Sequence, residues 1–418
     1  MRILILSINY WPEVTGIGAF TTYRAEYLAA AGHQVEVCTT FPYYPEWKVP
    51  ASYKGRFAST EQRNGVCVVR SYAYIPNPVT ALRRVIHEGS FIVSSLIRAF
   101  FRKRPDVLVA VSPPLGLAVP AMLLSRIWRI PYVFDVEDLQ PDSAADLGML
   151  PGWVIRLLYG LEKSAYRNAA LVTTLTPSMR QRIIGKGIAE DKVSLVEPRM
   201  DESFADLSPA EGSAFRQQYQ FGDKFLVVYS GNMGVKQGLD VVLDAASLNR
   251  ADTSIVFLLV GGGADHDRLQ RRAAELNLSN IRFMPLLDEP GFRGLVAASD
   301  ICLVTQQRSV SEVAFPSKVV TYFAAACAIV ASVNPDSEVA QVIRESGSGK
   351  VVPAEDAKAL LSAILELRNN DLQGLGRTGR DYARRRWAAA RVLRHLEQSL
   401  ASVAANGTRA IPQEGVLR

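Results

Sequence analysis

Apolar, strand-like runs alternate with helical stretches along the first half of the chain. "RILILSI" is followed by the helical "AFTTYRAEYLAAAG" and then by "QVEVCTT". Later come "DVLVAVS", a helical stretch through "AVPAMLLSRIW", "PYVFDVE", a helical stretch through "VIRLLYGLEKSAYRNA", and "LVTTLTP". Continuously apolar strands that alternate with helices are typical of a parallel sheet covered on both faces.

The pattern changes after "KVSLVEP" and then begins again. Residues 201–222 are polar and acidic, which is typical of a connection, and the alternation restarts with "FLVVYSG" and "SIVFLLVGGG". The sequence therefore predicts an α/β protein with two Rossmann-like domains, residues 1–200 and 201–375, whose parallel sheets face each other across a cleft. We expect a last helix over 376–400, which could pack back on the N-terminal domain, and a flexible tail over 404–418.

Composition and charge narrow the class of protein. Of the 418 residues, 48% are apolar and 21% are charged, which is the balance of a folded globular protein. The formal charge of +6 is small for this length. It does not indicate nucleic acid, and it suits an anionic small ligand or an anionic membrane surface equally.

The cysteines, the histidines and the N-terminal residues indicate which features we expect the protein to lack. The four cysteines are scattered without a C-x-x-C pair, which argues against a metal cluster or a disulfide framework and favours a reducing compartment. The four histidines show no ligand spacing, so we expect neither metal nor cofactor. The first apolar run is interpreted as a buried strand and not as a signal peptide, and apolar stretches such as "GSFIVSSLI" fall short of the ~20 residues of a spanning helix. We expect a cytoplasmic protein.

Glycine-rich loops follow several predicted strands. Gly16 and Gly18 precede a helix, where bare backbone and free N–H groups could meet an anion, although a tight turn explains them equally. The dinucleotide pattern G-x-G-x-x-G is absent, which argues against a dehydrogenase. In "YSGNMGVKQGLD" glycines flank Lys236 directly after a strand, and we interpret Lys236 as a phosphate-binding cation rather than as a solvated lysine.

A second cation stands at the start of the helix in "FPSKVVTYFAAACAIVAS". Pro316 suits the first helical turn, whose N–H groups lack internal partners, while Ser317 and Lys318 add a hydroxyl and an ammonium. The helix dipole adds positive potential. An ordinary cap with an exposed lysine would explain this segment alone, but together with the Lys236 loop it predicts a site for a diphosphate.

Four acidic residues end or follow the strand "PYVFDVE": Asp135, Glu137, Asp138 and Asp142. Carboxylates in a cleft could orient sugar hydroxyls or act as a base. We select Asp138 as the candidate base because Asp135 could still lie within the strand. Asp142 is interpreted as a helix cap.

Residues 81–105 hold six Arg and Lys and only one acid, Glu88, interleaved with large apolar side chains. A basic amphipathic helix of this kind can lie on an anionic membrane. A helix that packs its apolar side on the sheet and exposes a basic face fits equally, and both interpretations stay open.

Together these motifs resemble family 4 glycosyltransferases, enzymes of the GT-B fold, over nearly the whole chain to about residue 395. The Gly16/Gly18 loop, "GNMGVKQGLD", "LLVGGG", "FMP" and "FPSKVVTYFAAACAIVAS" occur in the family's order and spacing. "DVEDLQPDSAADLGML" and "YYPEW" look most like the branch of the colanic acid biosynthesis fucosyltransferase and related exopolysaccharide enzymes.

The resemblance implies transfer of a sugar, with retention and without a metal, from GDP-fucose or a UDP-sugar to a polyprenyl-diphosphate-linked saccharide. It places the donor mainly on the second domain, the acceptor on the first, and the protein at the inner face of the cytoplasmic membrane. Asp138, Lys236 and Lys318 would act in catalysis. The donor-binding positions would be Gly16, Gly18, Gly231, Asn232, Gly262, Pro285, Glu312, Ser317 and Thr321.

The chain departs from the family pattern at several positions. Asn232 replaces the Arg of G-R-x-x-x-x-K-G, and Gln237 stands where its lysine is expected. Thr321 replaces the second Glu of the E-x7-E pattern that holds the ribose, Glu312 lies one place from the first, and Asp135 replaces a histidine found in many relatives. These replacements keep two alternatives open: a sugar-nucleotide epimerase or hydrolase, and a catalytically inactive nucleotide-sugar-binding subunit of a polysaccharide assembly.

Overall fold

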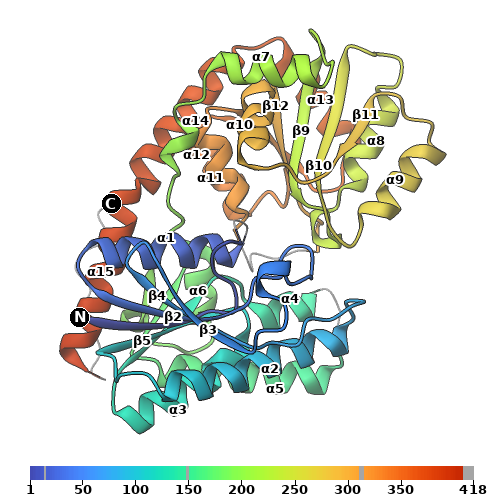
Figure 1. Ribbon diagram of the computed structural model, residues 1–418. Helices are drawn as coiled ribbons and strands as arrows, with labels where there is room; N and C mark the ends of the chain where they lie inside the picture. Colours follow the sequence, from blue (N-terminus) through green and yellow to red (C-terminus); the bar gives the residue numbers. More distant parts are fainter. Residues whose placement is uncertain (14–15, 147–149, 310–314, 408–418) are drawn as a thin grey trace. The chain divides into compact units, whose positions relative to one another are not determined.

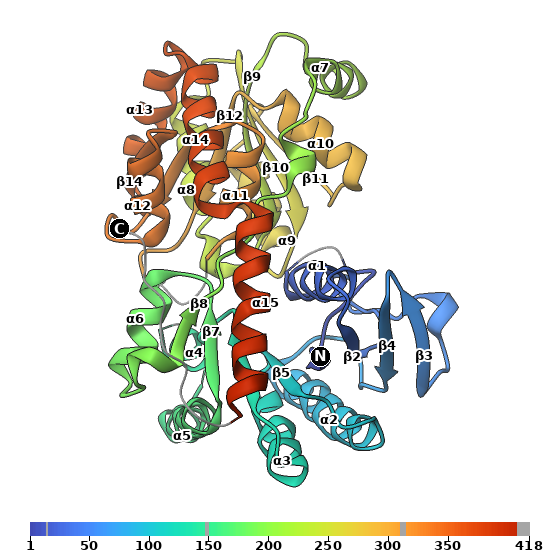
Figure 2. The same cartoon turned by 90° about the vertical axis from the view of Figure 1, so that its left-hand side faces the viewer.

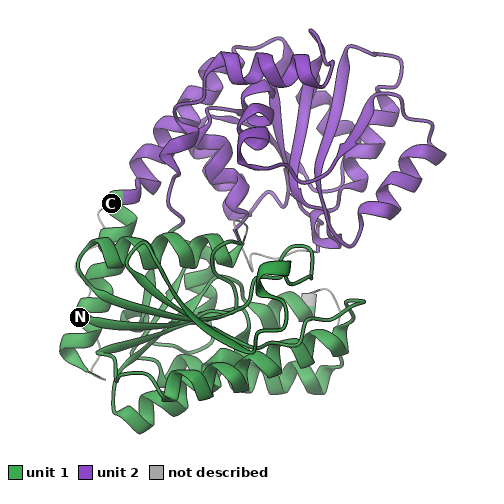
Figure 3. Ribbon diagram, viewed as in Figure 1, with its two compact units in different colours: residues 1–197, 390–418 green, residues 198–389 purple. Residues whose placement is uncertain are grey.

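Two compact units make up the protein, which is described by a computed structural model (Figure 1). Unit 1 comprises residues 1–197 and 390–418, and unit 2 comprises residues 198–389 (Figure 3). The structure describes residues 1–13, 16–146, 150–309 and 315–407. The division after residue 197 lies three residues from the boundary expected at 200.

Unit 1 is built on an eight-stranded sheet in the order β3-β4-β2-β1-β5-β6-β7-β8. Its strands are β1 Arg2–Leu6, β2 Gln34–Thr40, β3 Ala58–Arg63, β4 Val66–Ser71, β5 Val107–Ser112, β6 Tyr132–Val136, β7 Leu171–Thr174 and β8 Val193–Leu195. All residues of β5 and β6 are buried, as expected for strands covered on both faces.

Helices cover both faces of this sheet. They are α1 Ile17–Ala30, α2 Ala81–Phe100, α3 Ala118–Trp128, α4 Gln140–Asp146, α5 Gly152–Asn168, α6 Pro177–Gly185 and α15 Ala389–Asn406, with 3₁₀ turns at Ala51–Tyr53, Leu115–Leu117 and Glu190–Lys192. Helices α2, α3 and α5 lie on one face of the sheet, and α1 and α15 lie on the other (Figures 1 and 2). Leu28 of α1 and Leu396 of α15 share one buried cluster with Ile3 and Val35 of the strands.

The edge of this sheet carries a hairpin that we had not predicted. Strand β3 pairs antiparallel with β4, whereas the other strand pairs of the sheet are parallel. Asn64 and Gly65 join the two strands with φ of 44° and 80°, the left-handed conformation that a two-residue hairpin turn requires. The Asn-Gly pair between two short runs was the signal in the sequence.

Unit 2 is built on a six-stranded parallel sheet in the order β11-β10-β9-β12-β13-β14. Its strands are β9 Phe225–Asn232, β10 Ile255–Gly262, β11 Ile281–Met284, β12 Ile301–Thr305, β13 Ala328–Val333 and β14 Gly349–Pro353. The order reverses between β9 and β12, which is the Rossmann arrangement with its ligand crevice at the carboxyl ends of those two strands. The prediction of two parallel-sheet, Rossmann-like domains is confirmed.

Side chains of β13 show how this sheet is covered. Val330 packs in one buried cluster with helices α8 and α13, while Ile329 and Ala331 pack in another with α11, α12 and α14. The helices are α7 Pro209–Gln218, α8 Asp240–Leu248, α9 His266–Glu275, α10 Glu289–Ala298, α11 Ser317–Ala324, α12 Glu338–Ser346, α13 Ala357–Arg368 and α14 Leu372–Trp387, with 3₁₀ turns at Glu202–Phe204 and Val235–Gln237.

The C-terminal segment differs from the single helix that we expected over residues 376–400. It forms two helices, because the chain leaves helical geometry at Ala388, with φ −52° and ψ 126°. Trp387 is buried in unit 2, whereas Val392 is buried in unit 1. Of the expected tail over 404–418, residues 404–406 still belong to α15, and residues 408–418 lie outside the described residues.

Among the described helices, none has the length and apolar character that a membrane crossing needs. No group of three or more described His, Cys, Asp or Glu residues is arranged to hold a metal ion.

Candidate active site

Lys318 lies at the crevice edge of the unit 2 sheet. It is the second residue of α11, and its ammonium lies 3.6 Å from the centroid of the Tyr229 ring in β9. A Cβ atom placed on Gly231 would come within 3.1 Å of the Lys318 Nζ, so this ammonium lies directly against the backbone at the carboxyl end of β9. The lysine is therefore turned inward toward the strand, and not outward into solvent as an ordinary cap would be.

The surroundings of Lys318 lower its affinity for a proton. Burial lowers the pKa of Lys318 to about 7. Its neighbours Tyr229, Tyr322 and Cys302 are themselves buried, and burial raises the pKa of each, so none carries a negative charge at neutral pH. An anion that binds beside Lys318 would supply a countercharge and would favour the ammonium form.

Lys236 lies in the 3₁₀ turn after β9. Its carbonyl oxygen accepts a hydrogen bond of 2.9 Å from the N–H of Gln307, which follows β12. This bond joins the two loops that flank the β9/β12 reversal. Gln237 closes the turn, because its Oε1 accepts a hydrogen bond of 3.1 Å from the N–H of Gly234.

The glycines after β9 and β10 have different roles. A Cβ atom on Gly261 would lie 2.1 Å from the carbonyl oxygen of Gly231, so the close approach of the two strands requires glycine there. Gly262 has open space around its Cα, and its carbonyl oxygen accepts from the N–H of Met233 at 2.7 Å. Asn232 and Pro285 are exposed at the carboxyl ends of β9 and β11. These three positions are accessible to a ligand.

The start of α11 carries two further predicted donor contacts. Ser317 is exposed at the first helical position, and Thr321 is partly buried one turn later. Glu312 lies outside the described residues. In unit 2 the structure thus brings Lys318, Gly231 and Ser317 to one end of the sheet, with the Lys236 loop beside β12.

In unit 1 the first glycine-rich loop packs tightly on itself. Gly16 has a φ of 58° and precedes α1, with open space around it. A Cβ atom on Gly18 would lie 2.7 Å from the carbonyl oxygen of Glu13, so this position requires glycine for packing. Of the two glycines, only Gly16 leaves room for a ligand.

A buried charged cluster lies at the carboxyl end of β6. Nη1 of Arg24 is 2.6 Å from Asp135 and 2.9 Å from Glu137, and Thr173 donates to Asp135 at 2.7 Å. Burial raises the pKa of Glu137 to about 8, although Arg24 lowers it. One guanidinium cannot neutralise two carboxylates, so a proton held on Glu137 leaves the cluster without net charge.

The four acids therefore take different roles. Asp135 lies inside β6 and is buried in the pair with Arg24, as its place at the strand end suggested. Asp138 is partly exposed and accepts a hydrogen bond of 3.1 Å from Ser143. Asp142 lies in the first turn of α4 and pairs with Lys186, the residue that follows α6. Sequence reasoning missed Arg24, whose only signal was the presence of two acids near a buried strand.

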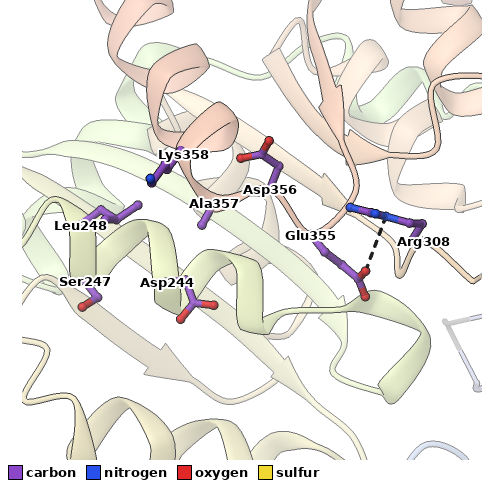
Figure 4. Close-up of a pocket in the computed structure, with 8 residues that line it drawn as sticks. All are labelled: Asp244, Ser247, Leu248, Arg308, Glu355, Asp356, Ala357 and Lys358. Atoms are coloured by element: carbon purple, nitrogen blue, oxygen red, sulfur yellow. Dashed lines mark ion pairs between the residues drawn. The ribbon is translucent and has the colours of Figure 1, made fainter.

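A separate hollow of about 460 Å³ opens on unit 2 (Figure 4). It is lined by Asp244, Ser247, Leu248, Arg308, Glu355, Asp356, Ala357 and Lys358. Its three carboxylates outnumber its two cations, and Arg308 already lies 3.9 Å from Glu355. This balance does not suit a diphosphate, and no predicted site residue lines the hollow.

Comparisons with known proteins decide the family. Residues 15–199 match the model of the glycosyl transferase 4-like domain, and residues 224–370 match that of the glycosyl transferases group 1. The chain is 33% identical over 374 residues to an Escherichia coli (strain K12) protein assigned to colanic acid biosynthesis as glycosyl transferase WcaI, covering 87% of this chain and 91% of that protein. The chain belongs to the family 4 glycosyltransferases.

More distant relatives agree with this family of glycosyltransferases. One is a GDP-mannose-dependent alpha-(1-6)-phosphatidylinositol monomannoside mannosyltransferase of Mycolicibacterium smegmatis, 22% identical over 92% of this chain and 94% of that protein. Among solved structures, sucrose-phosphate synthase of Thermosynechococcus elongatus superposes with a TM-score of 0.77 at 16% identity, covering 97% of this chain and all of the other. HepE of Anabaena with UDP-glucose gives 0.73 at 17% identity, covering 96% and 100%. These structures show the GT-B fold, as predicted.

Two departures from the glycosyltransferase pattern now have a structural setting. Gln237, at the family's lysine position, is a turn-closing residue, while Asn232, at the arginine position, is exposed at the strand end. The cation that the structure places against β9 is Lys318 of α11.

Proposed function

We propose that this glycosyltransferase moves a sugar from a nucleotide-sugar to a lipid-diphosphate-linked saccharide in exopolysaccharide biosynthesis, with retention. The observation that carries the proposal is the inward-turned ammonium of Lys318 against the carboxyl end of β9. No described carboxylate is paired with this ammonium, and a cation so placed at that end of a Rossmann-type sheet suits a diphosphate. The similarity to WcaI supports the polysaccharide context.

The relatives suggest a few candidates for the base and the sugar of the donor. HepE binds UDP-glucose, and the mycobacterial relative depends on GDP-mannose. We propose GDP-fucose or a UDP-sugar as the donor.

In the proposed reaction the bond between the sugar's anomeric carbon and the diphosphate oxygen breaks, and its electron pair stays on the diphosphate. Lys318, Lys236 and the N-terminus of α11 stabilise that negative charge. The acceptor hydroxyl attacks the anomeric carbon, and its proton passes to Asp138 or to a phosphate oxygen of the donor. This chemistry uses no metal.

Release of nucleoside diphosphate from candidate donors, with a lipid-linked acceptor present, tests the proposal. We expect Lys318→Ala to lower kcat about 10²–10³-fold, as loss of a group that stabilises developing charge does. Lys358→Ala, which removes an exposed lysine of the hollow in Figure 4, is the matched control and should change nothing. Unchanged turnover of Lys318→Ala would contradict the assignment, and donor consumption without an acceptor would indicate a hydrolase or an epimerase.

We also propose that unit 1 docks on an anionic membrane through α2. Helix α2 buries Phe91 and Ala99, yet it leaves Leu82 and Val85 72% and 65% exposed among its arginines. The neighbouring helices add exposed apolar side chains, Leu123 and Ile127 from α3 and Trp153 and Leu157 from α5 (Figure 1). One side of the 81–105 segment packs on the sheet, and the apolar residues that remain uncovered beside basic ones support the membrane interpretation.

Co-sedimentation with vesicles tests this surface. We expect binding to vesicles that contain phosphatidylglycerol, weaker binding to pure phosphatidylcholine, and loss of binding in the double variant Leu82→Asp/Val85→Asp. High salt should weaken the interaction because the arginines contribute by charge. Equal recovery of the variant and the unchanged protein would contradict the proposal.

A further inference from the structure

A cluster of aromatic rings lies at the crevice edge of the unit 1 sheet. The segment 41–47 follows β2 and carries "FPYYPEW", a motif that the donor site does not use. The ring centroids of Tyr43 and Trp47 are 5.2 Å apart, and each packs on His87 of α2, at 4.6 and 5.4 Å. The cluster thus joins the loop after β2 to the first half of α2.

A buried carboxylate holds the loop in place by accepting hydrogen bonds from its backbone. Oε1 of Glu13 accepts hydrogen bonds of 2.8 Å from the N–H groups of both Tyr43 and Tyr44, and its Oε2 accepts one of 2.8 Å from Asn9. The N–H of Lys48 donates to the carbonyl oxygen of Tyr43 at 3.1 Å, which closes the segment. The aromatic side chains are therefore held in place before any ligand arrives.

Part of the cluster faces solvent. Tyr43 and His87 are buried, with 5% and 2% of their surface exposed, whereas Tyr44 and Trp47 are only partly buried. Trp47 has a φ of 52°, which is unfavourable for a bulky residue. A strained backbone at a partly exposed position indicates that this tryptophan serves binding rather than core packing.

Positive charge and apolar surface adjoin the aromatic rings. The guanidinium of Arg84 lies 5.8 Å from the Trp47 ring centroid, and Arg84 is exposed. The side chain of Arg83 instead donates hydrogen bonds to the carbonyl oxygens of Asn77 and Pro78.

Leu82, Val85 and Ile86, on the same turns of α2, are 72%, 65% and 49% exposed. A flat aromatic face, an exposed guanidinium and exposed apolar side chains therefore lie close together.

We infer that Trp47 and Tyr44 stack on the sugar ring of the acceptor, that Arg84 pairs with its diphosphate, and that the exposed start of α2 receives its lipid. The inference rests on the proposed function, in which the acceptor is a lipid-diphosphate-linked saccharide. Aromatic rings offer large, rigid surfaces with little entropy to lose, and arginine matches phosphate oxygens with paired N–H donors. The aromatic, cationic and apolar side chains gathered here correspond to the sugar, the diphosphate and the lipid of such a molecule.

Fluorine NMR of protein carrying 5-fluorotryptophan tests the inference without a donor. The five tryptophans give separate signals, and Trp47→Phe assigns the signal of Trp47. The probes are farnesyl diphosphate linked to glucose, to galactose and to N-acetylglucosamine, with farnesyl diphosphate alone as the sugar-free probe. We expect at least one sugar-bearing probe to shift the Trp47 signal saturably, and Arg84→Ala to raise its Kd about tenfold.

Arg126→Ala, which removes an exposed arginine of α3, is the matched control and should leave the Kd unchanged. The inference is overturned if the Trp47 signal stays in place with all three sugar-bearing probes. It is also overturned if the sugar-free probe shifts this signal equally, because stacking on the sugar is then absent.

Transfer kinetics separate the inference from the proposed function. Trp47→Ala and the milder Trp47→Phe should raise the KM for the lipid-linked acceptor, about tenfold for Ala, with the KM for the donor unchanged. Leu248→Ala, at an exposed apolar residue of α8 in unit 2, should have no effect on either KM. Transfer with an unchanged acceptor KM in Trp47→Ala refutes the inference and leaves the proposed function standing, whereas a responsive Trp47 signal without any sugar transfer refutes the function alone.

Discussion

At the scale of single residues, Lys318 is the most informative side chain of the proposed donor site, because its charge should depend on a bound anion. Lys318 lies against the Tyr229 ring, and burial brings its pKa to about 7. Nucleotide binding should therefore be accompanied by proton uptake above neutral pH, and affinity should decline as the pH rises. The tyrosine face partly offsets the lost hydration of the ammonium.

The same group makes stability depend on pH. The folded-state pKa of about 7 lies below the ordinary value of 10.5 for the unfolded chain, so between these values the unfolded state binds more protons. The free energy of unfolding of the wild type, relative to Lys318→Met, should rise from pH 7 to pH 9 by up to about 1.4 kcal/mol per pH unit. Denaturant titrations of both proteins at pH 6, 7, 8 and 9 measure this, and a constant difference would contradict the low pKa.

The candidate residues of the site could be predicted from the sequence, whereas their contacts in the fold could not. Lys236 and the acids around β6 were evident from their positions after apolar strands, and Lys318 was evident from its place at the start of an apolar helix. Their partners were not, because pairing across the fold depends on which side chains meet in three dimensions. Arg24 reaches Asp135 over a separation of 111 residues, and no local pattern encodes such a contact.

At the scale of elements, close packing of α14 against the end of α11 holds α11 in place. A Cβ atom on Gly376 of α14 would lie 1.8 Å from the carbonyl oxygen of Ala326, directly after α11. Nε of Arg380 donates to the carbonyl oxygen of Ala324 at 3.0 Å. The two helices can meet this closely only because residue 376 has no side chain.

Gly376→Ala should therefore destabilise unit 2. The clash is with backbone and cannot be relieved by a rotamer change, so we expect a loss of about 1–3 kcal/mol. Gly160→Ala in α5 is the control: it is exposed with open space around it, and it should gain up to about 1 kcal/mol through helix propensity. Calorimetry with hydrogen exchange of α11 measures both effects, and an unchanged α11 in Gly376→Ala would contradict this packing.

Element types were largely readable from apolar periodicity, whereas one boundary was not. The sequence "RRRWAAARVLR" contains neither glycine nor proline, and alanines favour a continuous helix. The break at Ala388 arises because Trp387 and Val392 are buried in different units. Tertiary burial thus overrides local propensity at this point.

On the scale of the whole molecule, α15 completes unit 1 from the far end of the chain. Val392, Leu396, Leu400 and Val403 are buried in the cluster that holds Ile3 of β1. Together their burial is worth at most roughly 6–12 kcal/mol, which is comparable to the whole stability of a typical domain.

Truncation after Ala389 should thus unfold unit 1 and leave unit 2 folded. Hydrogen exchange should rise to unprotected rates in peptides of β1, β2 and β5, while peptides of β9 and β12 stay protected. Truncation after Gly407 keeps all four side chains and serves as the control. Continued protection of β1 in the shorter protein would show that the cluster closes without α15.

This connectivity has a consequence during synthesis on the ribosome. The residues of unit 2 leave the exit tunnel as one uninterrupted stretch, and they can fold as soon as they emerge. The N-terminal half is made earlier, but its apolar surface stays uncovered until the segment that forms α15 has been translated. Nascent chains stalled before that segment should consequently be the ones that chaperones retain.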